Sequence, residues 1–346
     1  MVVTIIIGIV ALSVILIVHE LGHFIAAKAT GIRVEEFGLG YPPRLVSFKR
    51  GETRYSLNAI PFGGFNRLTG EEDPKDPRSL AGKSRGIRLL VLSSGSLMNF
   101  LLAFLLFSII FMLPGDAETG QVVVEEVAPN SPASMAGIEA GDIILSINDQ
   151  PVDSNTKLSQ YIEDNLGKET TIVVQHSDST KENIQLIPRQ QPPEGEGAIG
   201  VAVRTLKRYP FWQAIPKGAA RLVETVVLWV KGLVSVFTGE ESAQFFGPVG
   251  IAQLTVEVAR LGIRPLLNVT ALISLILSIC NLFPLPAIDG GRIAFVFLEW
   301  VRRGKRVPPK IEGMVHLIGL AMLLVFMFAV TYQDIARIIS GESLIP

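Results

Sequence analysis

Four long runs of uncharged, mostly apolar residues constrain the fold of this chain more than any other feature of its sequence. A helix needs roughly 20 apolar residues, at about 1.5 Å each, to cross a hydrocarbon core. The run Leu89–Leu113 has 25 residues without a charge, and Leu266–Ile288 has 23. Val2–Val18 and Leu317–Gln333 have 17 each. We therefore expect a polytopic α-helical membrane protein with about four transmembrane helices.

The composition agrees with a chain that lies partly in lipid. Charged residues make up 18% of the sequence and the mean hydropathy is +0.42, whereas soluble domains carry about 25% charge. The net charge of −1 offers no basic footprint for nucleic acid. The expected partner is the lipid bilayer, with no nucleic acid, and the oligomeric state is left open. The lone cysteine, Cys280, cannot form an intrachain disulfide.

The distribution of charge predicts the orientation of the spans. Residues 28–88 hold 12 Lys/Arg against 7 Asp/Glu, and residues 292–312 hold 6 against 2. Residues 114–265 hold 12 against 19. By the positive-inside rule the first two segments are cytoplasmic, and the third lies outside together with both termini. No positive charge precedes Val2, so the first run is interpreted as a span rather than a cleavable signal peptide.

A metal-binding pattern lies at the end of the first span. His19-Glu20-Leu21-Gly22-His23 matches H-E-x-x-H. Side chains at i and i+4 share a helical face, so both imidazoles can bind one ion beside Glu20. Zinc suits imidazole ligands, and a catalytic zinc uses three protein ligands with one position left for water. Five residues can match by chance, but ionisable groups at the end of an apolar span are costly and indicate function.

Asp289 is the candidate for the third ligand. It follows the Leu266–Ile288 run, which the charge rule also has crossing from outside to inside, so both sites approach the same membrane face. Pro284 and Pro286 free the backbone from regular helix and let a carboxylate turn toward the metal. The alternative is that Asp289-Gly290-Gly291 is only the interfacial turn that ends a span.

The combination of motifs resembles the site-2 protease family, in particular bacterial members similar to regulator-of-sigma-E protease. It is carried by His19-Glu20-Leu21-Gly22-His23 and by Asn281-Leu282-Phe283-Pro284-Leu285-Pro286-Ala287-Ile288-Asp289-Gly290-Gly291. The resemblance implies that His19, His23 and Asp289 bind Zn2+ and that Glu20 is the catalytic base. It also implies that Asn281 holds substrate or the developing oxyanion. The alternative for Asn281 is an amide that satisfies backbone groups at the helix break.

Two further segments are compared with the family. Phe62–Glu71 resembles its membrane-associated β-hairpin, whose exposed edge would add an unfolded substrate as another strand. The resemblance makes Gly63, Gly64 and Phe65 substrate-binding residues; an ordinary turn is the alternative. Asn66 replaces the hydrophobic residue usual in the family. Ser94–Asn99 departs from the family's Gly-Pro form, and only a packing role is expected for it.

The segment expected outside the membrane, residues 114–265, begins with a predicted mixed α+β domain. Gln121–Val127 predicts a strand, Pro129–Ile138 a turn and short helix, and Gly141–Asn148 an alternating strand. This order resembles a bacterial PDZ domain that extends to about Val203. Its groove would take a peptide by strand addition. The alternative is a steric filter that admits only trimmed substrates, and it is favoured because one sequence shows no ligand specificity.

A charged amphipathic helix follows Pro210. Its apolar residues recur at alternating spacings of 3 and 4: Trp212, Ile215, Ala219, Leu222, Val226, Trp229 and Leu233. It is expected to lie in the membrane interface, with a core helix of a soluble subdomain as the alternative. Only a turn is expected at Gly247–Ile251.

These predictions divide the chain into four parts. Residues 1–114 form an N-terminal membrane part with the hairpin, and residues 115–205 the inserted extracytoplasmic PDZ domain. Residues 206–265 hold the interfacial helix and linker, and residues 266–346 the C-terminal membrane part. The resemblance places the chain in the bacterial cytoplasmic (inner) membrane, with its active site near the cytoplasmic face.

The expected function is intramembrane zinc proteolysis. The substrates implied by the resemblance are single-span membrane proteins, such as trimmed anti-sigma factors or remnant signal peptides. Two alternatives are a PDZ-bearing membrane adaptor with a structural or vestigial metal site, and a zinc transporter, in which intramembrane His and Asp are also expected. A structural zinc has no need of the Glu20 carboxylate, which favours the enzyme.

Overall fold

The computed structural model describes residues 2–71, 74–193, 195–240 and 246–340. The chain divides into two compact units. The first, here called the membrane unit, comprises Met1–Ser108 and Lys217–Pro346. The second, the α+β unit, comprises Ile109–Pro216. The finer division into four parts stays a prediction.

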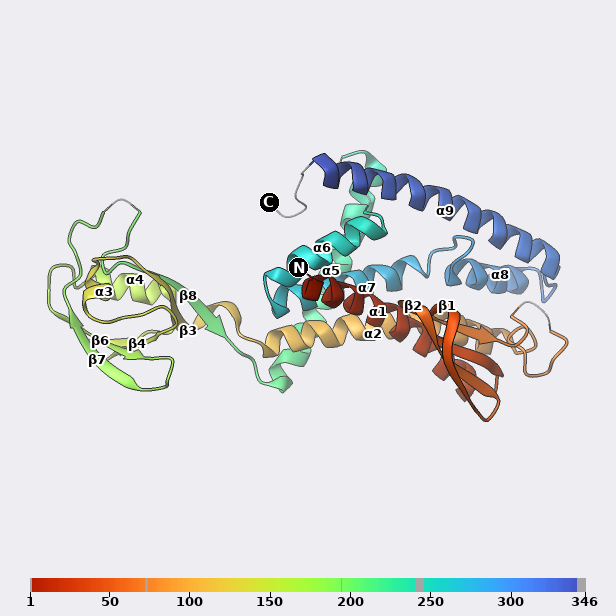
Figure 1. The fold of residues 1–346 in the computed structure, drawn as a ribbon, viewed down its shortest axis with the longest axis horizontal. Coiled ribbons are helices and arrows are strands. Elements are labelled where there is room, and N and C mark those ends of the chain that lie inside the picture. The colour runs from red at the N-terminus through yellow and green to blue at the C-terminus, as the bar shows by residue number, and fades with distance from the viewer. Residues whose placement is uncertain (1, 72–73, 194, 241–245, 341–346) are drawn as a thin grey trace. The chain divides into compact units, whose positions relative to one another are not determined.

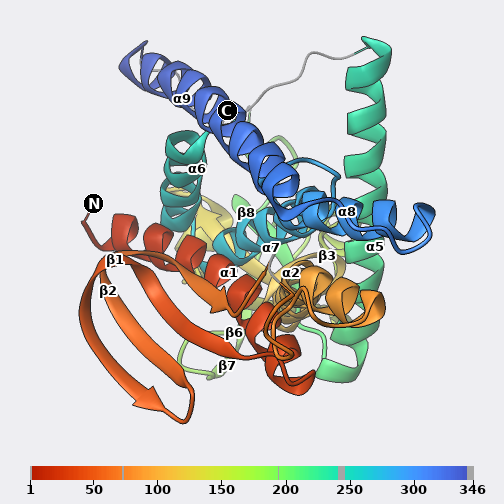
Figure 2. The same ribbon diagram turned by 90° about the vertical axis from the view of Figure 1, so that its right-hand side faces the viewer.

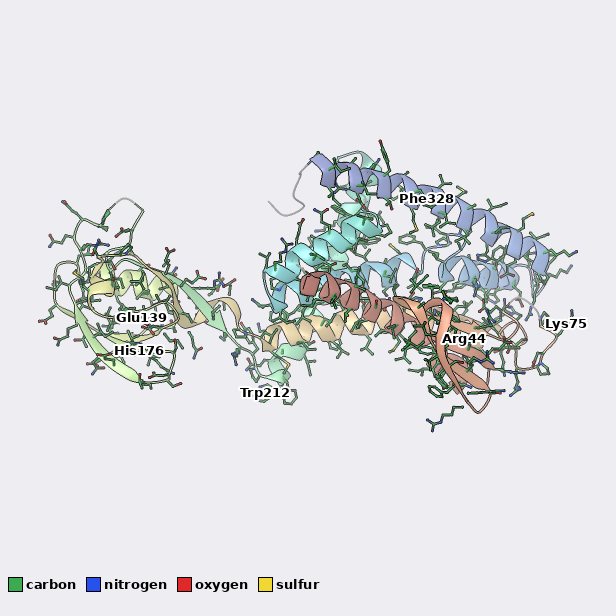
Figure 3. All side chains as sticks on the ribbon, in the orientation of Figure 1. Arg44, Lys75, Glu139, His176, Trp212 and Phe328 are labelled. Atoms are coloured by element: carbon green, nitrogen blue, oxygen red, sulfur yellow. The ribbon has the colours of Figure 1, made fainter. Side chains whose placement is uncertain are left out.

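Four helices are long and apolar enough to cross a membrane, which confirms the expected number of spans among the described residues. They are α1 (Val2–Ala29), α2 (Arg85–Met112), α7 (Ile263–Cys280) and α9 (Pro309–Ser340) (Figure 1). Lipid offers no hydrogen-bond partners, so a segment that crosses it must pair its own backbone N–H and C=O groups, as a helix does. For this reason α1 is helical although its sequence is rich in β-branched residues. The side chains of α9 are mostly exposed, among them Phe328, which is labelled in Figure 3. Lipid is the expected neighbour of such a surface.

Three more helices connect these spans: α5 (Phe211–Thr238), α6 (Pro248–Arg260) and α8 (Asp289–Val301). Helix α5 confirms the expected amphipathic helix, whereas α6 begins where only a turn was expected. Gly247 is its N-cap and Pro248 opens its first turn, where a missing N–H costs nothing. The Asp334 carboxylate on α9 accepts the Gly250 N–H at 2.8 Å and so joins the start of α6 to α9.

The third span ends eight residues before the end of its apolar run. Helix α7 stops at Cys280 with Asn281 as its C-cap, because Pro284 and Pro286 cannot continue it. The chain then turns back: the Gly290 N–H donates to the Asn281 carbonyl at 2.7 Å. Asp289 is therefore the first residue of a new helix, α8, rather than part of a simple interfacial turn.

The expected hairpin is a longer, curled structure that lies beside α1 (Figure 2). Strands β1 (Val34–Arg50) and β2 (Thr53–Leu68) pair antiparallel. Phe37 pairs with both Asn66 and Tyr55, so the first half of β1 lies between the two ends of β2. This register leaves the Gly64–Leu68 segment at one edge of the described sheet.

Among its described residues, the α+β unit holds a six-stranded antiparallel sheet and two helices that lie wholly within the unit. Its path order is β7-β6-β4-β3-β8, and β5 pairs with β4. The strands are β3 (Gly115–Val127), β4 (Ile143–Ile147), β5 (Gln150–Pro151), β6 (Thr170–Gln175), β7 (Lys181–Leu186) and β8 (Val201–Lys207). The helices are α3 (Pro132–Met135) and α4 (Asn155–Glu163). The predicted order of strand, short helix and strand is confirmed by β3, α3 and β4.

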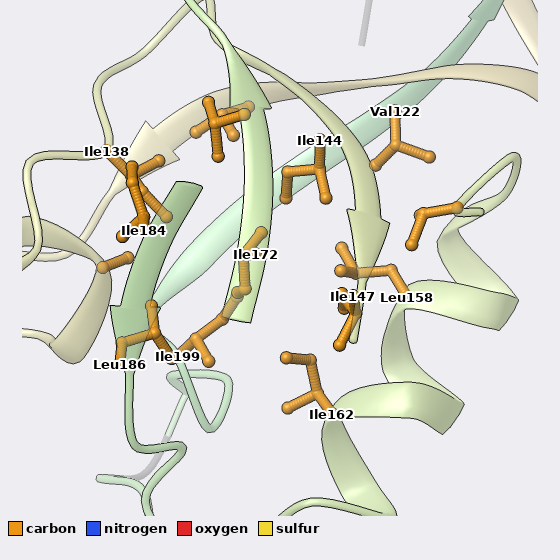
Figure 4. Close-up of a cluster of buried hydrophobic side chains, with 14 residues drawn as sticks. Val122, Ile138, Ile144, Ile147, Leu158, Ile162, Ile172, Ile184, Leu186 and Ile199 are labelled. Atoms are coloured by element: carbon orange, nitrogen blue, oxygen red, sulfur yellow. The ribbon is translucent and has the colours of Figure 1, made fainter. Parts of the chain in front are cut away.

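The core of this unit follows from the period of its strands. In β6, Thr170, Ile172 and Val174 are buried and alternate with half-buried residues, as expected for a sheet packed on one face. Ile144, Ile172 and Leu158 belong to one cluster of buried aliphatic side chains (Figure 4). Each such side chain contributes roughly 1.5–3 kcal/mol by leaving water.

Candidate metal centre

Helix α1 presents both imidazoles of the H-E-x-x-H motif on one face. His19 and His23 are buried near its end, with side chains 10% and 11% exposed. Their Nε2 atoms lie 3.1 Å apart, since residues four apart are neighbours on a helix. The motif therefore brings two ligand nitrogens to one point.

Helix α8 brings a carboxylate to the same point. Asp289 Oδ2 lies 3.0 Å from Nε2 of His19 and 3.1 Å from Nε2 of His23, across 270 residues of sequence. The two glycines that follow allow this approach. A Cβ on Gly290 would stand 1.9 Å from the Phe283 carbonyl oxygen, and one on Gly291 2.3 Å from that of Leu285. Only glycine lets α8 start so close to the turn after α7.

The three donor atoms have the spacing of a zinc ligand set. Ligands about 2.0 Å from a tetrahedral ion stand about 3.3 Å apart, close to the observed 3.0–3.1 Å. His19, His23 and Asp289 form the one described group of three or more ligating side chains that could hold a metal. Two imidazoles and one carboxylate are also a known catalytic zinc set. The geometry of the three residues fits Zn2+.

Gly95 of α2 keeps the space beside these donors open. A Cβ at this position would stand 2.3 Å from Nε2 of His23 and 2.7 Å from Nε2 of His19. Any other residue would therefore displace the imidazoles or fill the position of an ion. A role limited to packing was expected for Ser94–Asn99, and the structure instead places Gly95 directly against the donors.

The other ring nitrogens of the two histidines also have partners. Nδ1 of His23 lies 2.8 Å from the Val91 carbonyl, which can accept its proton. Nδ1 of His19 lies 3.4 Å from the side-chain amide of Asn99. The amide nitrogen of Asn99 is the atom nearest Nδ1, and its amide oxygen is buried without a hydrogen-bond partner among the described residues. A half-turn of the amide would exchange the two atoms and place the oxygen at Nδ1 as an acceptor. Such partners fix the ring orientation in which Nε2 binds a metal.

Glu20 lies beside the donors and is held by the hairpin. The Asn66 side-chain amide donates to the Glu20 carboxylate at 3.2 Å and also to the Glu20 backbone carbonyl. Sequence reasoning missed this role. The signal was a polar side chain at a position where the family resemblance implied an apolar one.

A polar pocket of about 200 Å³ contains the centre. It is lined by all four residues of the proposed zinc and base set and by Asn66, Glu71 and Arg292, among others. Arg292 of α8 pairs with Glu71, which follows β2, at 2.6 Å. The pocket thus joins α1, the hairpin segment and α8.

The remaining predicted site residues lie near this pocket but do not line it. A Cβ on Gly64 would be 3.8 Å from Cγ of Glu20, and one on Gly63 would be 3.1 Å from Leu16. The Phe65 ring stacks on Tyr41 with centroids 6.4 Å apart. Asn281 caps α7 and its backbone carbonyl accepts from Gly290.

Comparison with known proteins decides the family. The profile described as Peptidase family M50 matches residues 7–326. The chain belongs to peptidase family M50. It is similar over most of its length to a chain from Clostridium acetobutylicum, 35% identical over 336 residues, which covers 96% of this chain and 97% of the relative. M50 membership confirms the predicted resemblance to the site-2 proteases.

A named relative and one solved structure add detail. Zinc metalloprotease RasP from Oceanobacillus iheyensis is 28% identical over 426 residues, which covers 97% of this chain and 99% of RasP. The crystal structure of a PDZ domain from an SdrC-like protein of Listeria innocua is 28% identical, with a TM-score of 0.21. It covers 24% of this chain and 92% of that domain.

Proposed function

We propose that this M50 protein is an intramembrane zinc metalloprotease that hydrolyses peptide bonds in or near transmembrane segments of other proteins. The observation that carries the proposal is the partly buried triangle of His19 Nε2, His23 Nε2 and Asp289 Oδ2, with edges of 3.0–3.1 Å. When bound there, zinc would acidify a water molecule and polarise the scissile carbonyl.

His19, His23 and Asp289 hold the ion in this proposal, and Glu20 is the general base. The Asn66 amide leaves the second Glu20 carboxylate oxygen free to take a proton and pass it to the leaving amine. A structural zinc would require no such carboxylate, which argues against the adaptor with a vestigial site. A transporter would require release of the ion, whereas the Val91 carbonyl orients the His23 imidazole for stable binding.

The substrate is proposed to extend the hairpin sheet. The Gly64–Leu68 segment is a sheet edge, and Asn66 within it contacts Glu20. A strand added along this edge would lie next to the base, which suits peptide hydrolysis because a helix must open before it is cut. Gly63, Gly64 and Phe65 would bind this strand, and Asn281 would hold substrate or stabilise the oxyanion.

The proposed orientation places both termini and the α+β unit outside and the metal centre near the cytoplasmic face of a bacterial inner membrane. The excess of Lys and Arg in residues 28–88 and 292–312 supports it. The proposed substrates are single-span proteins, such as trimmed anti-sigma factors or remnant signal peptides. The α+β unit would act as a PDZ-type steric filter; peptide binding at the edge strand β8 is the alternative.

Substitution of the base tests the proposal. Purified Glu20→Gln protein is expected to bind zinc like the parent but to cleave a model transmembrane substrate about 10²- to 10⁴-fold more slowly. Glu224→Gln, which removes an exposed carboxylate on α5, is the matched control and should cleave normally. Parental cleavage by Glu20→Gln protein would refute the role of Glu20.

A further inference from the structure

A second cavity lies between α2 and α8, lined by residues other than those of the metal pocket. It has a volume of about 390 Å³ and is lined by Arg85, Leu89, Val296, Phe297 and Trp300. Four of the five side chains are apolar. Trp300 is 67% exposed and Phe297 49%, so the cavity is an apolar slot that opens to the surroundings of the protein.

The mouth of this slot is strongly basic. The first turn of α2 supplies Arg85 and Arg88, and the turn after α8 supplies Arg302, Arg303, Lys305 and Arg306. These two turns adjoin, because Nη2 of Arg85 would lie 3.6 Å from a Cβ on Gly304.

Glu299, in the last turn of α8, is paired with three of these six cations, and Glu71 and Glu312 line a neighbouring pocket together with Arg88 and Arg306. Glu299 is buried, with Arg88 at 2.5 Å and Arg306 at 3.3 Å. Arg85 is 3.8 Å from it, and its side chain is 42% exposed. Arg302, Arg303 and Lys305 are exposed. A local excess of positive charge therefore remains beside the slot.

The position of the slot indicates a membrane ligand. Arg85 is the first residue of the span α2, so the mouth lies where that span leaves the hydrocarbon. Exposed Trp side chains are enriched at this level of a bilayer. Basic pockets between helices at such an interface bind anionic lipid headgroups.

We propose that this cavity binds one anionic phospholipid. An acyl chain would fill the slot along Leu89, Phe297 and Trp300, and the phosphate would lie against Arg85 and the basic turn Arg302–Arg306. A zwitterionic lipid could fill the slot but would bring its own cation toward the arginines. Asp289 is the first residue of the helix that carries Trp300, so the lipid would also brace the helix that supplies the carboxylate of the metal centre.

Trp300 provides a direct reporter of this site. Replacing the other two tryptophans in Trp212→Phe/Trp229→Phe protein leaves Trp300 as the single tryptophan. The full chain is reconstituted in phosphatidylcholine vesicles that contain increasing fractions of brominated phosphatidylglycerol or brominated phosphatidylcholine. Brominated phosphatidylglycerol is expected to quench Trp300 saturably, at a several-fold lower mole fraction than brominated phosphatidylcholine.

Charge removal tests the headgroup contact. Arg85→Gln/Arg302→Gln/Arg303→Gln protein should lose the preference for phosphatidylglycerol, by about fivefold for each cation that contacts the headgroup. Lys231→Gln/Arg260→Gln, which removes two exposed cations elsewhere in the membrane unit, should keep it. Parental zinc content in each variant shows that the fold is intact. Equal quenching by the two lipids, an unchanged preference in the triple variant, or an equal loss in the control would overturn the proposal.

Discussion

Gly95 shows how one missing side chain can define a metal site. We predict that Gly95→Ala protein loses zinc, because the added Cβ would stand 2.3 Å from Nε2 of His23. Removing a hydrogen-bond partner of a metal ligand lowers metal affinity roughly 10- to 100-fold. The loss of affinity in Gly95→Ala protein should be at least as large. Metal content of the purified protein, measured by mass spectrometry, checks this.

A second glycine in the same helix serves as the control for this prediction. Nothing lies within 4 Å of a Cβ on Gly86, so Gly86→Ala protein should keep its zinc. Full zinc content in Gly95→Ala protein would contradict the position assigned to the ion.

Asn66 is predicted to position the general base. Asn66→Leu removes the hydrogen bond of 3.2 Å to the Glu20 carboxylate. A hydrogen bond to a charged group contributes about 1.5–3 kcal/mol, so kcat should fall roughly 10- to 100-fold while zinc content stays parental. Single-turnover cleavage of a model substrate measures this. A parental kcat would show that Glu20 needs no such partner.

At the scale of residues, the sequence predicted the site residues whose positions follow from local spacing. It did not predict those that reach the site through tertiary contacts. H-E-x-x-H places two imidazoles together through helix geometry alone, and Asp289 followed from the order of spans and the family motif. No sequence spacing predicts that Gly95 and Asn66 lie at the metal centre. They reach the centre because α2 and β2 pack against α1, which no single segment reveals.

Among the structural elements, α8 is joined across the metal pocket to the segment that follows β2 by the ion pair of Arg292 and Glu71. Arg292 lies one turn after Asp289 and contacts Glu71 at 2.6 Å. Both side chains are partly exposed, so the pair is worth at most about 1 kcal/mol. Arg292→Gln is therefore predicted to speed the loss of zinc to a chelator by up to about fivefold.

A reversed pair distinguishes the contact from a general charge effect. Glu71→Arg/Arg292→Glu protein should return toward the parental rate of zinc loss, and Arg221→Gln, which breaks the exposed α5 pair with Glu224, should not change it. Identical rates in the parent and the Arg292→Gln protein would exclude a role for the pair in closing the pocket.

The bounds of elements were predicted less well than their existence. The 23-residue run Leu266–Ile288 indicated one span that Pro284 and Pro286 break near its end. Helix α7 already ends at Cys280, four residues before the first of these prolines. Helix α8 was missed because glycines at its start favour a turn locally. Its position depends on the close approach of Gly290 and Gly291 to the preceding turn.

At the scale of the whole molecule, the α+β unit carries a titratable contact of its own. His176, labelled in Figure 3, forms hydrogen bonds with the carboxylates of Glu182 at 3.1 Å and Asp142 at 3.0 Å. The Glu182 carboxylate, followed by that of Asp142, raises the pKa of His176 above its ordinary value near 6.5. The protonated histidine therefore stabilises this unit fully below about pH 6.5, and the contribution is lost as the pH rises through the raised pKa.

Hydrogen exchange of the full chain can follow this contribution. After correction for intrinsic rates, strands β6 and β7 should exchange faster at pH 8.5 than at pH 6, and His176→Asn should reduce the difference. An equal pH response in the two proteins would show that His176 does not couple to the stability of the unit.

The division into a membrane part and an inserted α+β domain was predictable because the two parts differ in amino-acid composition. Long uncharged runs and a charged, strand-rich middle segment differ in hydropathy over tens of residues. The metal centre, by contrast, depends on residues 270 positions apart. The order of the spans and the charge bias predict only that such residues approach the same face of the membrane. The packing of the helices then brings their side chains into contact.

X-ray absorption at the zinc edge of the purified chain tests the proposed metal centre. About one zinc per chain is expected, bound by two imidazole nitrogens and a carboxylate oxygen at about 2.0–2.2 Å. His19→Ala, His23→Ala and Asp289→Ala should each lower zinc content and remove their own ligand from the spectrum. A parental protein without zinc, or an Asp289→Ala protein with parental zinc content and an unchanged spectrum, would contradict it.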